Sequence, residues 1–240
     1  MGPKIERQLW YQGCRSWHDF LANPNEISAG QADRAFVLEI LQHSVEALAA
    51  KDHSFFMKGL GLADSWRAFP DFREHCVYLD IETDGGNGGN SITTVGLYDG
   101  VEYQCLIKGK DLQRLPEVLK GYGMIVTFFG AGFDIPMVQK KFRTLTIDQL
   151  HLDLCPTLRK LGIRGGLKAI EKSLGLQRGE DTDGLSGMDA IRLWNRYKLL
   201  NDEQALQTLV AYNREDVVNL EHLALYAYDR LKAQTLVPAR

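Results

Sequence analysis

Cysteine is scarce in this chain, and no two cysteines have the spacing of a metal-binding motif. The four cysteines form no Cys-x-x-Cys pair and no cluster with histidine; they are Cys14, Cys76, Cys105 and Cys155. This excludes a zinc site built on cysteine. We interpret the four side chains as reduced thiols of a cytoplasmic protein.

Long hydrophobic runs are also missing. No stretch reaches the roughly 18 apolar residues that a membrane-spanning helix needs. The first ten residues, MGPKIERQLW, contain no apolar run of the kind found in a signal peptide. We therefore expect no transmembrane helix, no membrane partner and a cytoplasmic location.

The sequence has no excess of positive charge. Its 28 basic residues are balanced by 31 acidic ones, which gives a formal net charge of −3. A protein that coats nucleic acid through its overall charge is therefore excluded, although a locally basic groove is not. Hydrophobic residues make up 45% and charged residues only 25% of the 240 positions, which excludes a mainly disordered chain.

The hydrophobic pattern changes at Cys76. Residues 1–75 are predicted to be helical, most clearly over 32–50, where apolar side chains recur at helical spacing. Strands are then predicted at 76–82, 91–98, 101–107, 124–129 and 149–154. Asp99-Gly100 favours a hairpin between the second and third strands. Helices are predicted at 112–121, 135–142, 156–161, 166–174, 187–199, 203–211 and 214–233.

This order of elements predicts an α/β fold with a mixed five-stranded sheet flanked by helices. We predict two parts, a helical N-terminal region over 1–75 and an α/β domain over 76–240. The N-terminal arm carries Trp10, Trp17 and Phe20. We expect these aromatics to pack against the core of the α/β domain; a surface for a partner is the alternative.

Two acids end the first predicted strand. Asp80 and Glu82 are two positions apart, so their side chains project from the same face of the strand. Two carboxylates this close repel each other unless a cation lies between them, and Mg²⁺ and Mn²⁺ prefer such oxygen ligands. The alternative is a pair of solvated acids before the Gly-rich stretch 84–89.

Three further residues extend this pattern. Asp134 lies where a buried strand leads into a helix, so it is either a metal ligand or a helix N-cap. Tyr212 and Asp216 are four positions apart and therefore share one face of a late helix. Alone, they also fit an amphipathic helix with tyrosine at its boundary.

The three motifs occur in an informative order, with Asp-x-Glu first, a lone Asp second and Tyr-x-x-x-Asp last. The chain therefore resembles the tyrosine branch of the DEDD 3′–5′ exonuclease superfamily. It is most similar to stand-alone bacterial predicted exonucleases with an RNase H-like fold, which are related to the proofreading domain of family B DNA polymerases. The resemblance covers about 76–233, through YLDIETDGG, SITTVGLYDG, VTFFGAGFDIPMV, HLDL, GGLKAIEKSLG and YNREDVVNL.

The resemblance implies an RNase H-like fold and a set of roles. Two divalent cations, Mg²⁺ or Mn²⁺, would be held by four carboxylates, and Tyr212 would orient the attacking water. The four carboxylates are those of Asp80, Glu82, Asp134 and Asp216, with Asp80 shared by both cations. One departure concerns the substrate, because Phe129 stands where the family often has asparagine.

The function expected from this resemblance is metal-dependent 3′–5′ exonuclease activity on nucleic acid with a free 3′ end. Single-stranded DNA is slightly favoured over RNA, although no group that would recognise a 2′-hydroxyl is identified. A structure-selective RNase H-like endonuclease and an inactive nucleic-acid-binding module are the alternatives. No protein partner is indicated, and a monomer is the default expectation.

Substrate contacts are predicted from residues near the motifs. The stretch 159–178 is rich in cations, of which Arg164, Lys168 and Lys172 are candidates for binding phosphates; a solvated helical surface is the alternative. Phe129 and Phe133 are candidates for stacking on bases, with core packing as the alternative. Asp153 is either an accessory acid or an ordinary acid at a strand end.

Overall fold

Five strands form one mixed sheet in a computed structural model that describes residues 2–28, 30, 32–86 and 91–236. The strands are β1 (Cys76–Thr83), β2 (Ile92–Tyr98), β3 (Tyr103–Ile107), β4 (Met124–Thr127) and β5 (Leu150–Asp153). Their order across the sheet is β3-β2-β1-β4-β5. Strand β2 pairs antiparallel with β1 and β3, whereas β4 pairs parallel with β1 and β5. The predicted α/β class with a mixed five-stranded sheet is confirmed.

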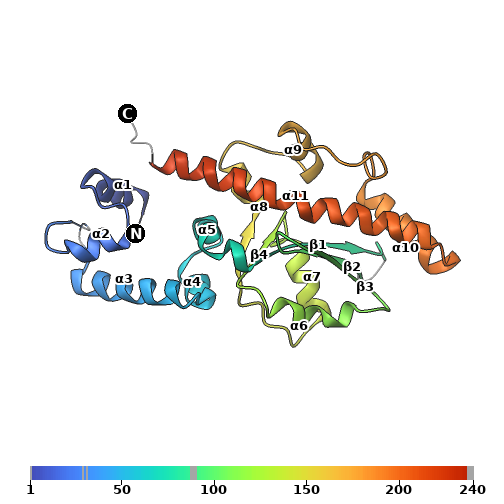
Figure 1. Cartoon of the computed structure of the whole chain (residues 1–240), viewed down its shortest axis with the longest axis horizontal. Coiled ribbons are helices and arrows are strands. Elements are labelled where there is room, and N and C mark those ends of the chain that lie inside the picture. Colours follow the sequence, from blue (N-terminus) through green and yellow to red (C-terminus); the bar gives the residue numbers. More distant parts are fainter. Residues whose placement is uncertain (1, 29, 31, 87–90, 237–240) are drawn as a thin grey trace.

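Helices cover both faces of this sheet, as Figure 1 shows. One face is covered by η3 (Leu112–Arg114), α6 (Leu115–Leu119) and α7 (Asp134–Lys141). The other face is covered by α8 (Leu154–Arg159), α9 (Leu167–Ser173) and α11 (Glu203–Leu236), and α10 (Gly187–Leu200) packs against α11 in a separate small cluster. The sheet is therefore the middle of three layers, with a hydrophobic core on each side.

The alternation of side chains along β1 decides what faces α11. Val77 and Leu79 belong to the core beneath α6 and α7, while Tyr78 belongs to the core shared with α11. Because side chains alternate between faces, Asp80 and Glu82 continue the face of Tyr78. The apolar half of β1 thus anchors the strand under α11, and the acidic end points the same way.

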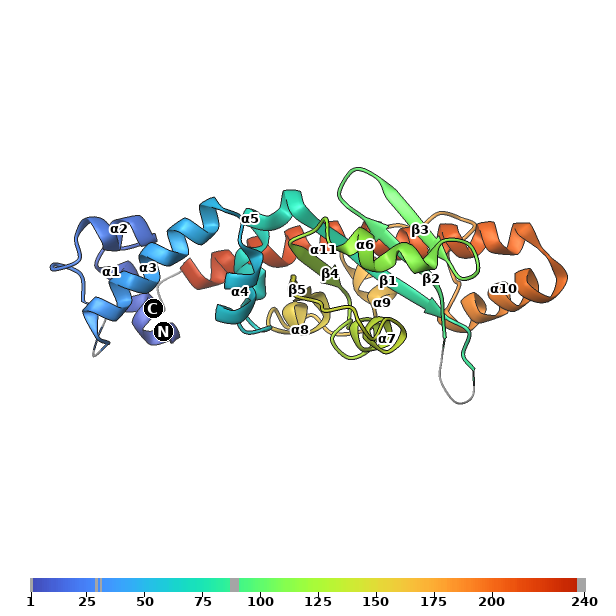
Figure 2. The ribbon, with the colours of Figure 1, turned by 90° about the horizontal axis from the view of Figure 1, so that it is seen from below.

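The N-terminal residues form helices up to Cys76. They are α1 (Pro3–Tyr11), α2 (Trp17–Ala22), α3 (Arg34–Ala49), α4 (His53–Gly59), η1 (Ser65–Ala68), α5 (Phe69–Phe72) and η2 (Arg73–His75). Figures 1 and 2 show α1 to α3 at one end of the molecule, near the C-terminal end of α11. Trp17 stacks on Phe56 of the main core with ring centroids 6.1 Å apart, whereas Phe20 belongs to a small separate core. The division into two parts at residue 75 stays a prediction.

The largest differences between the predicted elements and the structure concern two helices and one strand. The helices predicted at 203–211 and 214–233 are one continuous helix, α11, because Asn213 at the expected break is buried and satisfied by tertiary hydrogen bonds. The strand predicted at 124–129 ends at Thr127, since Phe129 has a left-handed φ of 64° that ends the extended backbone. None of the helices in the described ranges combines the length and apolar character needed to span a membrane.

Candidate metal centre

The acidic end of β1 lies at an opening between the strands. Strand β1 pairs with β4 only as far as Tyr78, which lies opposite Val126. Asp80 follows two residues later, where β1 no longer pairs with β4. Asp80 and Glu82 are half-buried and line a pocket of about 420 Å³, together with Lys168 and residues of α11. The early end of β4 thus leaves room beside the two carboxylates.

Helix α11 brings two of the predicted residues to this pocket. Tyr212 and Asp216 both line it, one turn apart on the helix face that covers β1. One carboxylate oxygen each from Asp80, Glu82 and Asp216 lies within 4.8 Å of the other two. The ring of Tyr212 is buried among Trp194 and its neighbours, so its position is fixed by packing.

Asp134 reaches the same region from the other side of β1. It is the first residue of α7 and is buried, and its Oδ1 accepts a hydrogen bond of 3.1 Å from the backbone N–H of Ile81. Ile81 stands between Asp80 and Glu82 in the chain, beyond the residues of β1 that pair with β4. Asp134 is therefore tied to the acidic strand end without joining the cluster of three close carboxylates.

Burial and mutual repulsion make the ionised cluster costly. Burial, and then the charges of Asp216 and its neighbours, raise the pKa of Asp80 well above its usual value. The same causes raise the pKa of Glu82 to about 8, and burial raises the pKa of Asp134 to about 7. Burial also raises the pKa of Asp216, against the opposing effect of Arg178. An arrangement of hard oxygen donors that repel one another fits Mg²⁺ or Mn²⁺.

A cation that fits this cluster should stabilise the protein. Mn²⁺ at about a hundred times its dissociation constant is expected to raise Tm by roughly 5–10 °C, through binding to the folded state alone. Differential scanning fluorimetry with Mn²⁺ and with chelator measures the shift. Asp80→Asn is expected to abolish the shift and, in chelator, to melt above the wild type because it removes one repelling charge. Identical melting of the wild type with and without Mn²⁺ would contradict a metal centre here.

Asn213 was not identified from the sequence, although it holds Asp80 in place. Its Nδ2 donates a hydrogen bond of 2.9 Å to Oδ2 of Asp80, and its Oδ1 accepts one of 3.0 Å from the hydroxyl of Tyr103. Gly96 lies opposite Asp80 on β2, and a Cβ there would come within 1.9 Å of Oδ1 of Asn213. The only hint in the sequence is a glycine in the middle of a predicted strand.

The predicted cations have different environments. Lys168 lines the pocket, with its ammonium 4.2 Å from the ring centroid of Tyr212, and donates a hydrogen bond to the carbonyl of Leu185. Arg164 and Lys172 are exposed and do not line this pocket. Arg178, which belongs to the same basic stretch, is buried and paired with Asp216. Of the three cations predicted to bind phosphates, the structure therefore brings only Lys168 to the carboxylates.

Asp153 organises the loop between β4 and α7. Its carboxylate accepts hydrogen bonds from the N–H groups of Phe129 (2.8 Å), Ala131 (3.1 Å) and Cys155 (3.0 Å). Through these three hydrogen bonds, Asp153 fixes the conformation of the loop and caps the N-terminus of α8. Phe129 and Phe133 are held in this loop with exposed side chains, at 53% and 37% of their full accessibility. Core packing, the alternative considered for both rings, does not occur.

Comparison with known proteins gives two findings. The family model described as RNase_H superfamily matches residues 77–228, which is more than half of the chain. Among solved structures, the chain is similar to the family B DNA polymerase from the hyperthermophilic archaeon Pyrobaculum calidifontis, with 15% sequence identity and a TM-score of 0.51. That match covers 65% of this chain and 24% of the polymerase chain, so this chain corresponds to about a quarter of the polymerase's length. No curated protein matches the sequence.

Proposed function

The chain belongs to the RNase_H superfamily, and from this membership and the carboxylate cluster we propose that it is a metal-dependent 3′–5′ exonuclease of the DEDD tyrosine branch. The observation that carries the proposal is the meeting of Asp80, Glu82 and Asp216 in one pocket that Tyr212 also lines. An RNase H-like fold by itself hosts several activities, so these side chains, and not the fold alone, support the exonuclease activity.

In this proposal the four acids hold two divalent cations. Asp80, Glu82 and Asp216 surround one position, and Asp80 with Asp134 would complete the second. When bound, the cations stabilise the charge that develops on the phosphoryl oxygens and make water a better nucleophile at neutral pH. Lys168, whose ammonium lies beside the cluster, would contact a phosphate oxygen of the substrate.

Tyr212 is assigned to orienting water and not to removing its proton. Burial, followed by the charges of Asp216 and Glu82, raises the pKa of the Tyr212 phenol above its ordinary value, which is already well above neutral pH. A phenol that keeps its proton at neutral pH is a hydrogen-bond donor and a poor general base. Tyr212 therefore fixes the position of the attacking water while its ring stays packed against Trp194.

The proposal is tested with 5′-labelled single strands of DNA and RNA, incubated with Mn²⁺, Mg²⁺ or chelator. Stepwise shortening from the 3′ end that stops in chelator is the expected result, and the better substrate identifies the preferred sugar. A circular single strand separates the alternatives, because an exonuclease leaves it intact and an endonuclease cuts it. Binding of both strands without any cleavage would support the inactive binding module and overturn the proposal.

Phe129 is proposed to stack on a base of the bound strand. Its backbone follows Phe128, which lines the pocket, and the N–H of Phe129 is held by Asp153. Phe129→Ala is expected to raise KM for a single strand roughly tenfold, because base–aromatic stacking contributes about 1–3 kcal/mol per base. Steady-state kinetics should show little change in kcat, since no reacting atom is touched.

Two controls frame this prediction. Phe129→Trp keeps a stacking surface and should keep KM. Val101→Ala removes an apolar side chain that is even more exposed than Phe129, from the β2–β3 hairpin, and should leave KM unchanged. An unchanged KM in Phe129→Ala would show that the ring makes no contact with substrate.

A further inference from the structure

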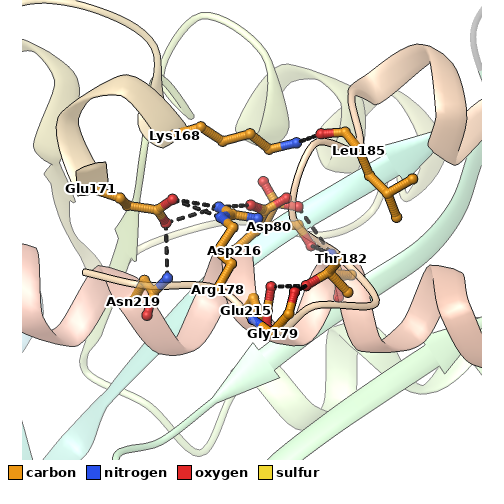
Figure 3. Close-up of polar contacts among 11 residues, drawn as sticks. Asp80, Lys168, Glu171, Arg178, Gly179, Thr182, Leu185, Glu215, Asp216 and Asn219 are labelled. Carbon is orange, nitrogen blue, oxygen red and sulfur yellow. Dashed lines mark hydrogen bonds and ion pairs between the residues drawn. The ribbon is translucent and has the colours of Figure 1, made fainter. Parts of the chain in front are cut away.

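A buried ion-pair network lies behind the metal ligand Asp216. Arg178, in the loop between α9 and α10, donates to Glu171 through Nε (2.7 Å) and Nη2 (2.8 Å), and Nη2 also donates to Oδ1 of Asp216. The side chains of Arg178, Glu171 and Asp216 are only 4%, 2% and 7% exposed. Figure 3 shows the guanidinium between the two carboxylates, beside Asp80. The network is therefore shielded from water and directly joined to the cluster.

The geometry leaves part of Asp216 available. Its contact with Arg178 is through Oδ1, and no hydrogen bond to its Oδ2 occurs among the described residues. One oxygen of Asp216 still lies within 4.8 Å of oxygens from Asp80 and Glu82. Because one edge of the carboxylate is fixed by a planar guanidinium, the rotamer of Asp216 is fixed as well.

Glu171 determines how much of the arginine's charge Asp216 experiences. It accepts two of the three hydrogen bonds that Arg178 donates and so takes the larger share of the guanidinium charge. Nη1 of Arg178 is buried without a hydrogen-bond partner in the described part of the chain, so all the hydrogen bonds of the guanidinium there go to these two carboxylates. The guanidinium carbon also lies 5.9 Å from the ring centroid of Tyr212. Asn219 donates a hydrogen bond of 3.0 Å to Glu171. With Glu171 ionised, the three charged groups keep a net charge of −1, which still attracts a cation.

The loop that carries Arg178 is fixed at further points by side chains of α11 and α9. Glu215 accepts hydrogen bonds from the N–H of Gly179 (2.7 Å) and from the hydroxyl of Thr182. Lys168 donates to the carbonyl of Leu185 at the far end of the loop. Figure 3 shows these contacts beside α11. These contacts fix the loop, and the fixed loop holds Arg178 against Asp216.

We propose that Arg178 and Glu171 are positioning residues for divalent-cation binding, with Arg178 fixing the orientation of Asp216 and Glu171 preventing Arg178 from cancelling its charge. The inference rests on the proposed function only in that the same carboxylates hold the cation. It assigns a role to two residues that touch neither substrate nor cation.

Mn²⁺ binding, measured by electron paramagnetic resonance and calorimetry on the full chain, tests the proposal without reference to hydrolysis. Glu171→Gln keeps the size and most hydrogen bonds of the side chain, and we expect it to weaken Mn²⁺ binding by roughly tenfold to a hundredfold. Arg178→Ala is expected to weaken binding similarly and to regain part of it when low millimolar guanidinium is added. Glu180→Gln, which removes an exposed acid from the same loop, is the matched control and should bind Mn²⁺ like the wild type.

The outcomes separate this inference from the proposed function. Unchanged Mn²⁺ affinity in folded Glu171→Gln overturns the positioning role, whatever the activity of the enzyme. If Arg178→Ala does not fold, Glu171→Gln decides alone, because it leaves no charge buried without a partner. A wild type that binds Mn²⁺ and hydrolyses no strand overturns the proposed function while the positioning role stands on the binding data. A wild type that binds no Mn²⁺ overturns both.

Discussion

Replacing Asp80 with asparagine is expected to lower the rate of phosphodiester hydrolysis by about a thousandfold or more, equivalent to roughly 4 kcal/mol of transition-state stabilisation. Asp80 lies at the centre of the site, since its carboxylate is close to those of Glu82 and Asp216 and is itself held by Asn213. Loss of one negative charge at this position weakens every cation position in the cluster. The rate of shortening of a labelled single strand, measured at a Mn²⁺ concentration that saturates the wild type, checks the prediction.

The fold of this variant should be unaffected. An asparagine oxygen can still accept the hydrogen bond from Nδ2 of Asn213, so the strand end keeps its main contact. Glu117→Gln, on the exposed side of α6, removes one acid at a distance from the site and serves as the matched control. Full activity in Asp80→Asn, with Mn²⁺ still required, would show that the cation binds elsewhere and would remove the basis of the proposed mechanism.

The acidic residues could be located from the sequence because short-range periodicity determines their directions. Alternation along a strand places Asp80 and Glu82 on one face, and helical spacing places Tyr212 and Asp216 on one face. In each case the neighbouring apolar residues determine which face is buried. Tyr78 faces α11 and Val217 packs in the same core, so the acidic end of β1 meets the part of α11 that carries Tyr212 and Asp216.

The surroundings of these acids could not be predicted, because they depend on contacts between distant segments. Arg178 and Lys172 look alike in the sequence, yet one is buried between two carboxylates and the other is exposed. Their neighbouring residues in the sequence do not distinguish them. The difference is that Arg178 contacts Asp216, which lies 38 positions later in the chain. Asn213 likewise owes its burial to the absence of a side chain at Gly96, on a strand far away in sequence.

The strained backbone at Phe129 could not be predicted from the sequence either. Phe129 adopts a φ of 64°, which a bulky residue seldom does, and the sequence predicted extended strand there. The hydrogen bonds that Asp153 accepts from Phe129 and Ala131 hold this conformation. A run of apolar residues such as MIVTFF indicates burial. It contains no information about Asp153, which lies on the next strand and fixes the loop by hydrogen bonds.

Gly96→Ala is expected to damage both stability and activity, because the new methyl group would occupy the place of the buried amide of Asn213. A Cβ at Gly96 would lie 1.9 Å from Oδ1 and 2.8 Å from Cγ of Asn213, whose side chain is fully buried. Asn213 must therefore move, and the hydrogen bond that orients Asp80 is lost. We expect a destabilisation of roughly 1–3 kcal/mol, typical of overpacked cores, measured by urea unfolding.

A double-mutant cycle with Asn213→Ala shows whether this mechanism is correct. If Asn213 is what the methyl group displaces, then Gly96→Ala should cost much less stability in a chain that already lacks the amide. Activity should behave differently, falling roughly tenfold to a hundredfold in both single variants without recovery in the double variant, since the support of Asp80 is missing in all three. Gly61→Ala, where a Cβ meets nothing within 4 Å, controls for the intrinsic effect of replacing glycine. Additive stability losses would mean that Gly96 is required for another reason, and recovered activity in the double variant would mean that Asn213 does not orient the metal ligand.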